Sequence, residues 1–70
     1  MREYISNEVN TLRLKKGTTQ EDVAEAVGVT RQTVIAMEKG NYTPSVHLAL
    51  KLAQYFKVPV ENIFKISYGT

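Results

Sequence analysis

The segment "TQEDVAEAVGVTRQTVIAMEKG", residues 19–40, contains two short helical patterns that are separated by a glycine. The first pattern ends at Gly28, and the second begins at the capping residue Thr30 and ends at Gly40. A glycine in so short a connection can adopt a positive φ, which lets two helices cross steeply. The arrangement is typical of a helix-turn-helix, although a small helical bundle without DNA-binding activity would show the same periodicity.

Three further helical patterns surround this segment. One extends from about Ser6 to Lys16 and is followed by a glycine in the C-cap position. Another begins after the capping residue Ser45 and ends near Lys57. The stretch "VPVENIF", residues 58–64, predicts a short fifth helix with Pro59 at its first turn. We therefore expect an all-α fold with five helices.

The period changes near the end of the chain, where apolar and polar residues alternate from Phe64 to Tyr68 as in a strand. Tyr4 and Ile5 occupy a comparable position near the other end. We expect the two termini to pair as a small two-stranded antiparallel sheet. The whole chain, residues 1–70, is predicted to be a single domain with its helix-turn-helix at about residues 19–39.

The composition excludes several classes of protein. The chain has 70 residues, no cysteine and one histidine, so we expect no disulfide, no metal site and no cofactor. His47 stands without a catalytic motif or a glycine-rich phosphate loop, which argues against an enzyme. No apolar run approaches the roughly 18 residues that span a membrane, and the first ten residues do not form a signal peptide. We expect a cytoplasmic protein without a small-molecule sensor domain.

Four motifs together identify a family: "TQEDVAEAVGV", "TRQTV", "EKGNYTPS" and "ALKLAQYFKV". In combination, from Asn7 to Phe64, they resemble the Cro/CI family of helix-turn-helix repressors. The resemblance implies a lambda-repressor-like DNA-binding domain. The chain is also similar to small stand-alone regulators of the cytolysin repressor type, which have terminal strands and form dimers. Thr18 and Pro59 depart from the family, which has an apolar residue and a Ser or Thr cap there, and both departures concern packing.

The resemblance assigns base reading to the start of the second helix of the motif. Arg31 and Gln32 match the family's main base-reading positions, and each side chain can form two coplanar hydrogen bonds with a purine. For Arg31 a phosphate contact is an equally good interpretation. Ile35 and Ala36 follow on the same helix face as Gln32, and we expect them to contact a thymine methyl group. The alternative is that both are tolerated surface residues.

Five further residues match family positions that contact the DNA backbone: Gln20, Thr33, Lys39, Asn41 and Tyr42. Gln20 opens the first helix of the motif, where unpaired backbone N–H groups favour a phosphate. For Thr33 the alternative is a role in capping the helix. For Tyr42 the alternative is a partly buried core position with its hydroxyl directed outward. Arg13 and Glu38 match an ion pair that joins the first helix to the end of the third. Two independent solvated charges are the alternative.

We expect a homodimer, because Phe64, Ile66 and Tyr68 give the C-terminal segment more apolar residues than a small monomer needs. A second apolar patch is expected from Leu48, Leu52 and Tyr55. Alternatively, the C-terminal segment covers only its own core.

The leading interpretation is a sequence-specific, double-stranded-DNA-binding transcriptional regulator, a repressor that binds a palindromic operator through the major groove as a homodimer. The second is an antitoxin or protein-interaction module with secondary DNA binding. The sequence does not identify the operator, the regulated gene or the inducing signal.

Overall fold

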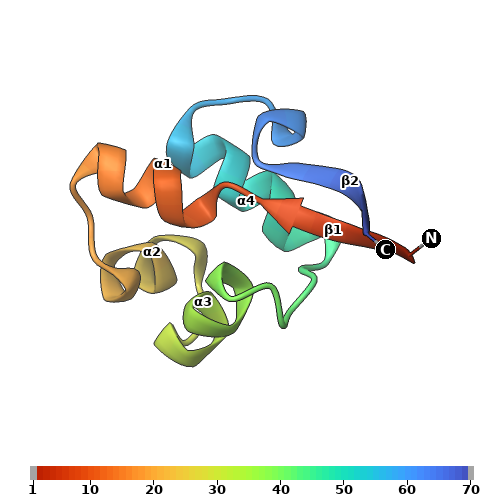
Figure 1. Cartoon of the computed structure of the whole chain (residues 1–70). Helices are drawn as coiled ribbons and strands as arrows, with labels where there is room; N and C mark the ends of the chain where they lie inside the picture. Colours follow the sequence, from red (N-terminus) through yellow and green to blue (C-terminus); the bar gives the residue numbers. More distant parts are fainter. Residues whose placement is uncertain (1, 70) are drawn as a thin grey trace.

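The computed structural model describes residues 2–69, in which four helices lie beside a two-stranded ribbon (Figure 1). The elements follow the chain in the order β1 (Arg2–Asn7), α1 (Val9–Lys16), α2 (Gln20–Val27), α3 (Arg31–Glu38), α4 (Val46–Phe56), η1 (Val60–Asn62) and β2 (Phe64–Gly69). The fold is therefore mostly helical with a small antiparallel sheet, and the predicted pairing of the two ends of the chain is confirmed.

Local side-chain caps set the beginnings of three helices. The Thr19 hydroxyl accepts from the Asp22 N–H, and the Asp22 carboxylate accepts in turn from the Thr19 N–H, so α2 begins with a complete capping box. These bonds to Thr19 hold the pKa of Asp22 below its ordinary value. Thr30 and Ser45 cap α3 and α4 in the same way, each accepting from the N–H three residues ahead. The caps predicted at Thr30 and Ser45 are thus confirmed.

The hydrophobic core consists of side chains from every helix together with Ile63 at the end of η1. Its members have at most 6% of their surface exposed: Val9, Val23, Ala24, Val27, Val34, Met37, Leu48, Leu52 and Ile63. Val34 and Met37 are the contribution of α3, and both are completely buried. Since they lie three residues apart on one side of α3, the opposite side of that helix faces away from the core.

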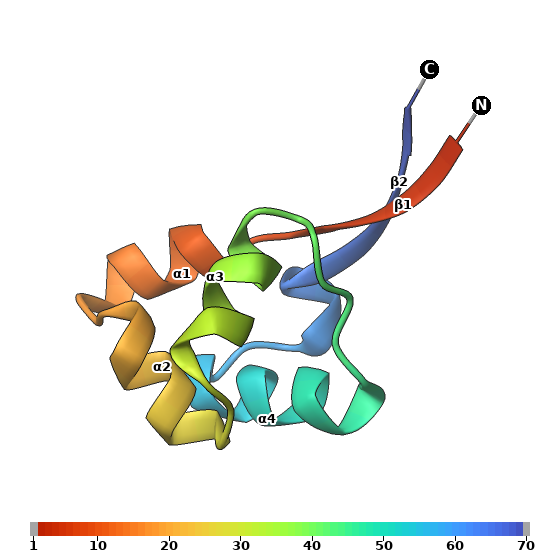
Figure 2. The ribbon, with the colours of Figure 1, turned by 90° about the horizontal axis from the view of Figure 1, so that it is seen from below.

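The ribbon of β1 and β2 extends away from the helices (Figure 2), and Arg2 pairs with Gly69 at its far end. Ile5 lies opposite Ile66, and Asn7 lies opposite Phe64. Because side chains alternate between the two faces of a strand, Ile5, Phe64, Ile66 and Tyr68 share one face of the ribbon. The hydroxyl groups of Ser6 and Ser67, on the other face, are 2.7 Å apart and join the two strands.

Two predictions about helices are wrong: the start of the first helix and the presence of a fifth helix. Ser6 and Asn7 belong to β1 rather than to the first helix, because both are paired with β2, and α1 begins only at Val9. The predicted fifth helix is a single 3-10 turn, Val60–Asn62. Pro59, which precedes it, offers no side-chain cap, and the chain must be extended again at Phe64 to join the ribbon. The predicted all-α class with five helices is therefore corrected to a mostly helical fold with four helices and a two-stranded sheet in the described residues.

Candidate nucleic-acid interface

The described part of the chain contains neither a membrane-spanning helix nor a cluster of metal ligands. Between residues 2 and 69, no helix is long and apolar enough to cross a membrane. Over the same residues, no group of three or more His, Cys, Asp or Glu side chains is arranged to hold a metal ion.

The outer face of α3 carries the residues that the sequence assigned to base reading. Arg31 and Gln32 are exposed at its N-terminal end. Ile35 and Ala36 follow one turn further on and are half-buried. Thr30 caps this first turn. Because Val34 and Met37 anchor α3 through its opposite side, Arg31 and Gln32 remain open to solvent. The structure thus gathers two hydrogen-bonding side chains and two apolar side chains on one short helix.

Gln20 and Arg31 border the same hollow, which has a volume of about 530 Å³ and lies between the starts of α2 and α3. Its remaining lining comes from Arg13, Thr18, Thr19 and Glu21. The N-terminus of α2 contributes unpaired backbone N–H groups, whose partial positive charge favours an anion. Gln20, which the sequence assigned to a phosphate, and Arg31, which it assigned to a base or a phosphate, thus lie beside one another at this hollow.

Three other residues assigned to the DNA backbone lie at the C-terminal end of α3 and in the loop after it, whereas Thr33 lies in its first turn. Lys39 and Asn41 are exposed, and Tyr42 has 42% of its surface exposed, outside the core cluster. The Asn41 N–H donates to the Ala36 carbonyl, which holds the start of the loop against the helix. The Thr33 hydroxyl lies 3.1 Å from that of Thr30, so it already takes part in the cap of α3.

Arg13 and Glu38 form the expected ion pair. Arg13 Nε donates to Glu38 Oε2 at 2.7 Å, and the terminal NH2 nitrogen of Arg13 donates to Oε1 at 3.2 Å. Only 12% of the Arg13 side chain and 6% of the Glu38 side chain are exposed. The two-bond geometry and the burial make this pair stronger than an ordinary surface salt bridge.

Two more side chains, which the sequence did not place in this cluster, donate to Glu38. Asn10 Nδ2 and Gln20 Nε2 each lie 3.1 Å from Glu38 Oε1, and Arg13 also donates to the Thr18 carbonyl at 3.0 Å. We call Asn10, Arg13, Gln20 and Glu38 the Glu38 cluster. Asn10 precedes Arg13 by three residues, a spacing that places the two side chains on the same face of α1. Gln20 retains one free amide hydrogen for an external acceptor.

The ionisation of the Glu38 cluster follows from its contacts. Burial by itself would raise the pKa of Glu38, but the hydrogen bonds from Arg13, Gln20 and Asn10 and the charge of Arg13 outweigh burial and hold this pKa below its ordinary value of 4.5. The hydrogen bond to Glu38 raises the pKa of Arg13 above its ordinary value. Both side chains are therefore charged at neutral pH, and α1, α2 and α3 meet at an intact ion pair.

The residues expected at a dimer contact have different locations. Ile66 and Tyr68 are 57% and 62% exposed on the ribbon, whereas Phe64 is half-buried against the core. The expected second patch is wrong, because Leu48 and Leu52 are core residues. The third member of that patch, Tyr55, is half-buried, packs edge-on against Phe56 and lies beneath the Lys16 ammonium.

The exposed apolar residues of α4 lie outside the expected patch. Val46 is 76% exposed and Leu50 is 51% exposed. An apolar groove of about 160 Å³ connects α4 with the ribbon, and it is lined by Ile5, Thr43, Pro44, Val46, Ala49, Val60 and Phe64. We call the surface formed by Val46, Leu50, Ile66, Tyr68 and this groove the apolar face.

Comparison with known proteins agrees with this geometry. A family model described as helix-turn-helix matches residues 9–63, from the start of α1 to the end of η1. The chain belongs to the helix-turn-helix family of transcriptional regulators. An uncharacterised HTH-type transcriptional regulator of Bacillus subtilis, YgzD, is 50% identical over 60 residues, which cover 86% of this chain and 91% of that protein.

Two further similarities connect this helix-turn-helix regulator with named proteins. The transcriptional repressor RstR of the cryptic phage CTXphi in Vibrio cholerae is 34% identical over 83% of this chain and 52% of its own length. The crystal structure of the restriction-modification controller protein C.AhdI from Aeromonas hydrophila superposes with a TM-score of 0.74. It is 31% identical to the helix-turn-helix regulator, and the match covers 79% of this chain and 83% of C.AhdI.

The lowered pKa of Glu38 predicts a specific dependence of stability on pH. A carboxylate whose pKa is lower in the folded state stabilises the fold fully above its unfolded pKa, near 4.5, and this contribution is lost as the pH falls through the folded pKa. We expect the free energy of unfolding of the wild type to fall more steeply between pH 5 and pH 3 than that of Glu38→Gln, measured by urea unfolding.

Asp22 contributes to acid destabilisation in both proteins and cancels in this comparison. Glu25→Gln, on the exposed side of α2, is the matched control and should retain the wild-type steepness. The same steepness in the wild type and in Glu38→Gln would show that the ion pair does not lower the pKa of Glu38.

Proposed function

We propose that this chain is a sequence-specific DNA-binding repressor that binds a palindromic operator through the major groove as a homodimer. The observation that carries the proposal is the combination of an exposed polar start of α3 with an opposite end held by the Glu38 cluster. A recognition helix needs such a fixed orientation to place its first turn against base edges. The similarity to RstR, which is named as a transcriptional repressor, supports the repressor role.

In the proposed complex the first turn of α3 reads the bases. Arg31 pairs with O6 and N7 of a guanine, and Gln32 pairs with N6 and N7 of an adenine. Ala36 is small enough to let the helix approach the groove closely, and its methyl group, with Ile35 beside it, contacts the C5-methyl group of a thymine. The partial exposure of Ile35 and Ala36, beside the exposed Gln32, supports this assignment.

The phosphate contacts lie on both sides of the reading helix. Gln20 uses its free amide hydrogen on one side, next to the N-terminus of α2. Lys39, Asn41 and Tyr42 provide the contacts on the other side, and Thr33 contributes its hydroxyl from α3. Such contacts fix the register on the duplex without reading its sequence.

The homodimer forms through the apolar face. Its most exposed members, Val46, Ile66 and Tyr68, are large apolar side chains that lie in water in a single copy, so their burial would stabilise a dimer. A second copy supplies an identical face and is the simplest way to cover it, since a two-fold interface is self-complementary. Two copies then present two α3 helices to half-sites about 34–36 Å apart.

A protein-interaction module is the second candidate, and the same apolar face supports it. An antitoxin would use this surface to bind an unrelated protein, with DNA binding as a secondary activity. The two candidates differ in what purifies with the chain: a second copy alone for the repressor, or a different small protein for the antitoxin.

Selection of bound duplexes from a random DNA pool tests the DNA-binding proposal. We expect an inverted repeat as the consensus, and in Arg31→Ala a relaxed preference at one position of each half-site. Lys39→Ala should weaken binding to all sequences alike and flatten the slope of log K against log salt by about one, while Lys57→Ala serves as the control outside the proposed contacts. The absence of a consensus together with salt-independent affinity would refute the proposal.

Substitution of Ile66 by Asp tests the proposed dimer contact. A carboxylate in the middle of the apolar face cannot be buried without a large desolvation cost, so Ile66→Asp should sediment as a monomer and bind the operator much more weakly. The matched control is Lys65→Asp, which places the same group on the opposite face of the same strand and should remain a dimer. A folded Ile66→Asp that remains a dimer would exclude the ribbon from the interface.

A further inference from the structure

Asn7 lies at the junction of the ribbon, α1 and α3. It is the last residue of β1, where it pairs with Phe64, and it is half-buried. Its neighbour Glu8 donates its backbone N–H to the Ile63 carbonyl at 2.9 Å. The pairing of the two strands therefore continues past Asn7 to Glu8 and Ile63, where the ribbon joins the helices.

The side-chain amide of Asn7 forms two hydrogen bonds of opposite sense. Its Oδ1 accepts from the Val9 N–H at 3.1 Å, which supports the start of α1, where Glu8 provides no side-chain cap. Its Nδ2 donates to the Met37 carbonyl at 3.0 Å, in the last turn of α3. An amide can accept and donate at the same time, whereas a carboxylate of the same shape can only accept.

The Met37 carbonyl accepts hydrogen bonds from outside α3 as well as from the turn that follows the helix. It belongs to the C-terminal turn, whose carbonyl groups lack partners within the helix, and it also accepts from the Gly40 N–H at 3.0 Å. The next N–H, that of Asn41, donates to the Ala36 carbonyl. Asn7 thus shares a carbonyl with the turn that leads into the loop of proposed phosphate contacts.

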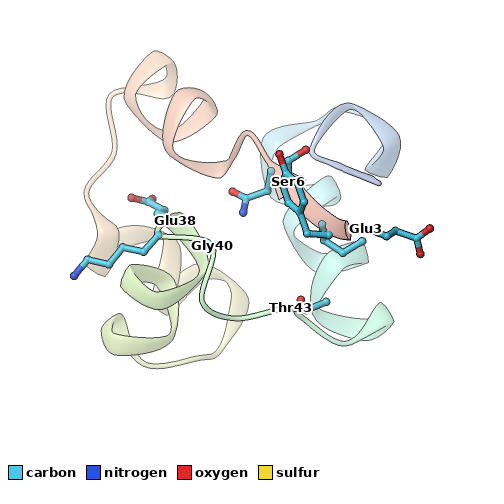
Figure 3. A pocket seen from close by; sticks show the side chains of 9 residues that line it. Glu3, Ser6, Glu38, Gly40 and Thr43 are labelled. Atoms are coloured by element: carbon cyan, nitrogen blue, oxygen red, sulfur yellow. The ribbon is translucent and has the colours of Figure 1, made fainter. Parts of the chain in front are cut away.

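Around this bond, β1 and the end of α3 are separated by open space. A hollow of about 670 Å³ lies between them, with Glu3 and Ser6 on the ribbon side and Gly40 and Thr43 on the loop side (Figure 3). Over residues 2–69, the bond from Asn7 to the Met37 carbonyl is the one hydrogen bond that joins β1 to α3. It is the direct polar connection between the proposed dimer element and the reading helix.

We infer that Asn7 is a positioning residue that couples the state of the ribbon to the C-terminal end of α3. When a second copy holds the ribbon, Asn7 is held in place, and the last turn of α3 and the loop after it become more ordered. Dimer formation then improves the contact of each copy with its own half-site, and DNA binding strengthens the dimer by the same factor. This inference rests on the proposed function for its dimer and its DNA.

Amide hydrogen exchange of the protein without DNA tests the coupling directly. Asn7→Asp retains the acceptor for Val9 and removes the donor to Met37, so exchange at Gly40 and Asn41 should accelerate about threefold to tenfold, as expected for the loss of one ordinary hydrogen bond. The matched control is Asn62→Asp, an exposed position with the same change of charge. The amide of Leu12, which donates to the Glu8 carbonyl at the start of α1, should be unaffected.

A cycle with Ile66→Asp separates coupling from local structure. In the Asn7 background, Ile66→Asp should accelerate exchange at Gly40 and Asn41 and weaken binding to a duplex with a single half-site. In the Asn7→Asp background it should change neither quantity further. If Asn7→Asp does not fold, the Ile66→Asp arm alone decides, because it leaves Asn7 intact.

The failures of the two proposals are distinguishable. A wild type that sediments as a monomer refutes the proposed dimer, and the coupling fails with it. If Ile66→Asp converts a dimer to a monomer while exchange at Gly40 and Asn41 is unchanged, or changes equally in both backgrounds, the coupling alone is refuted. Acceleration at Leu12 instead of Gly40 would assign Asn7 only to the start of α1.

Discussion

The orientation of α3 depends on one carboxylate. Glu38 accepts hydrogen bonds from Arg13 and Asn10 of α1 and from Gln20 of α2, so three helices meet at its two oxygens. Loss of one partner from a largely buried ion pair costs about 3–5 kcal/mol, a large share of the 5–15 kcal/mol that stabilises a small domain. The apolar contacts of Val34 and Met37 hold α3 against the core, and Glu38 fixes the polar end of the helix.

The two ends of α3 have different constraints, which suit so short a helix to the proposed base-reading role. Its N-terminal turn is capped by Thr30 within the motif and remains open to solvent at Arg31 and Gln32. Its C-terminal turn is held by the Glu38 cluster and by the hydrogen bond from Asn7 to the Met37 carbonyl. Gln20 belongs to both the Glu38 cluster and the proposed phosphate surface. The same side chain therefore helps to orient α3 and would contact the DNA backbone in the proposed complex.

Local signals made much of the fold predictable from the sequence. The caps at Thr19, Thr30 and Ser45 are short-range hydrogen bonds, and they lie where the residue types predict them. The errors arise where distant residues decide. Ser6 is in a strand because Lys65 pairs with it, and the predicted fifth helix is reduced to a turn because Phe64 must be extended to join the ribbon. On α4 the expected patch was wrong because packing against the other helices buries Leu48 and Leu52 and leaves Val46 and Leu50 exposed. The family resemblance, rather than periodicity, indicated the pair of Arg13 and Glu38, and the roles of the DNA-contact residues remain predictions.

A double-mutant cycle between Arg13→Ala and Glu38→Gln tests the central claim most directly. The free energy of unfolding and the affinity for a selected operator are measured for the wild type, both single variants and the double variant. The account predicts an interaction of at least about 1 kcal/mol in unfolding, within the range for residues in direct contact, and a loss of operator affinity that is likewise less than additive. Additive effects in both measurements would mean that the ion pair does not hold the recognition helix, and the account would be wrong.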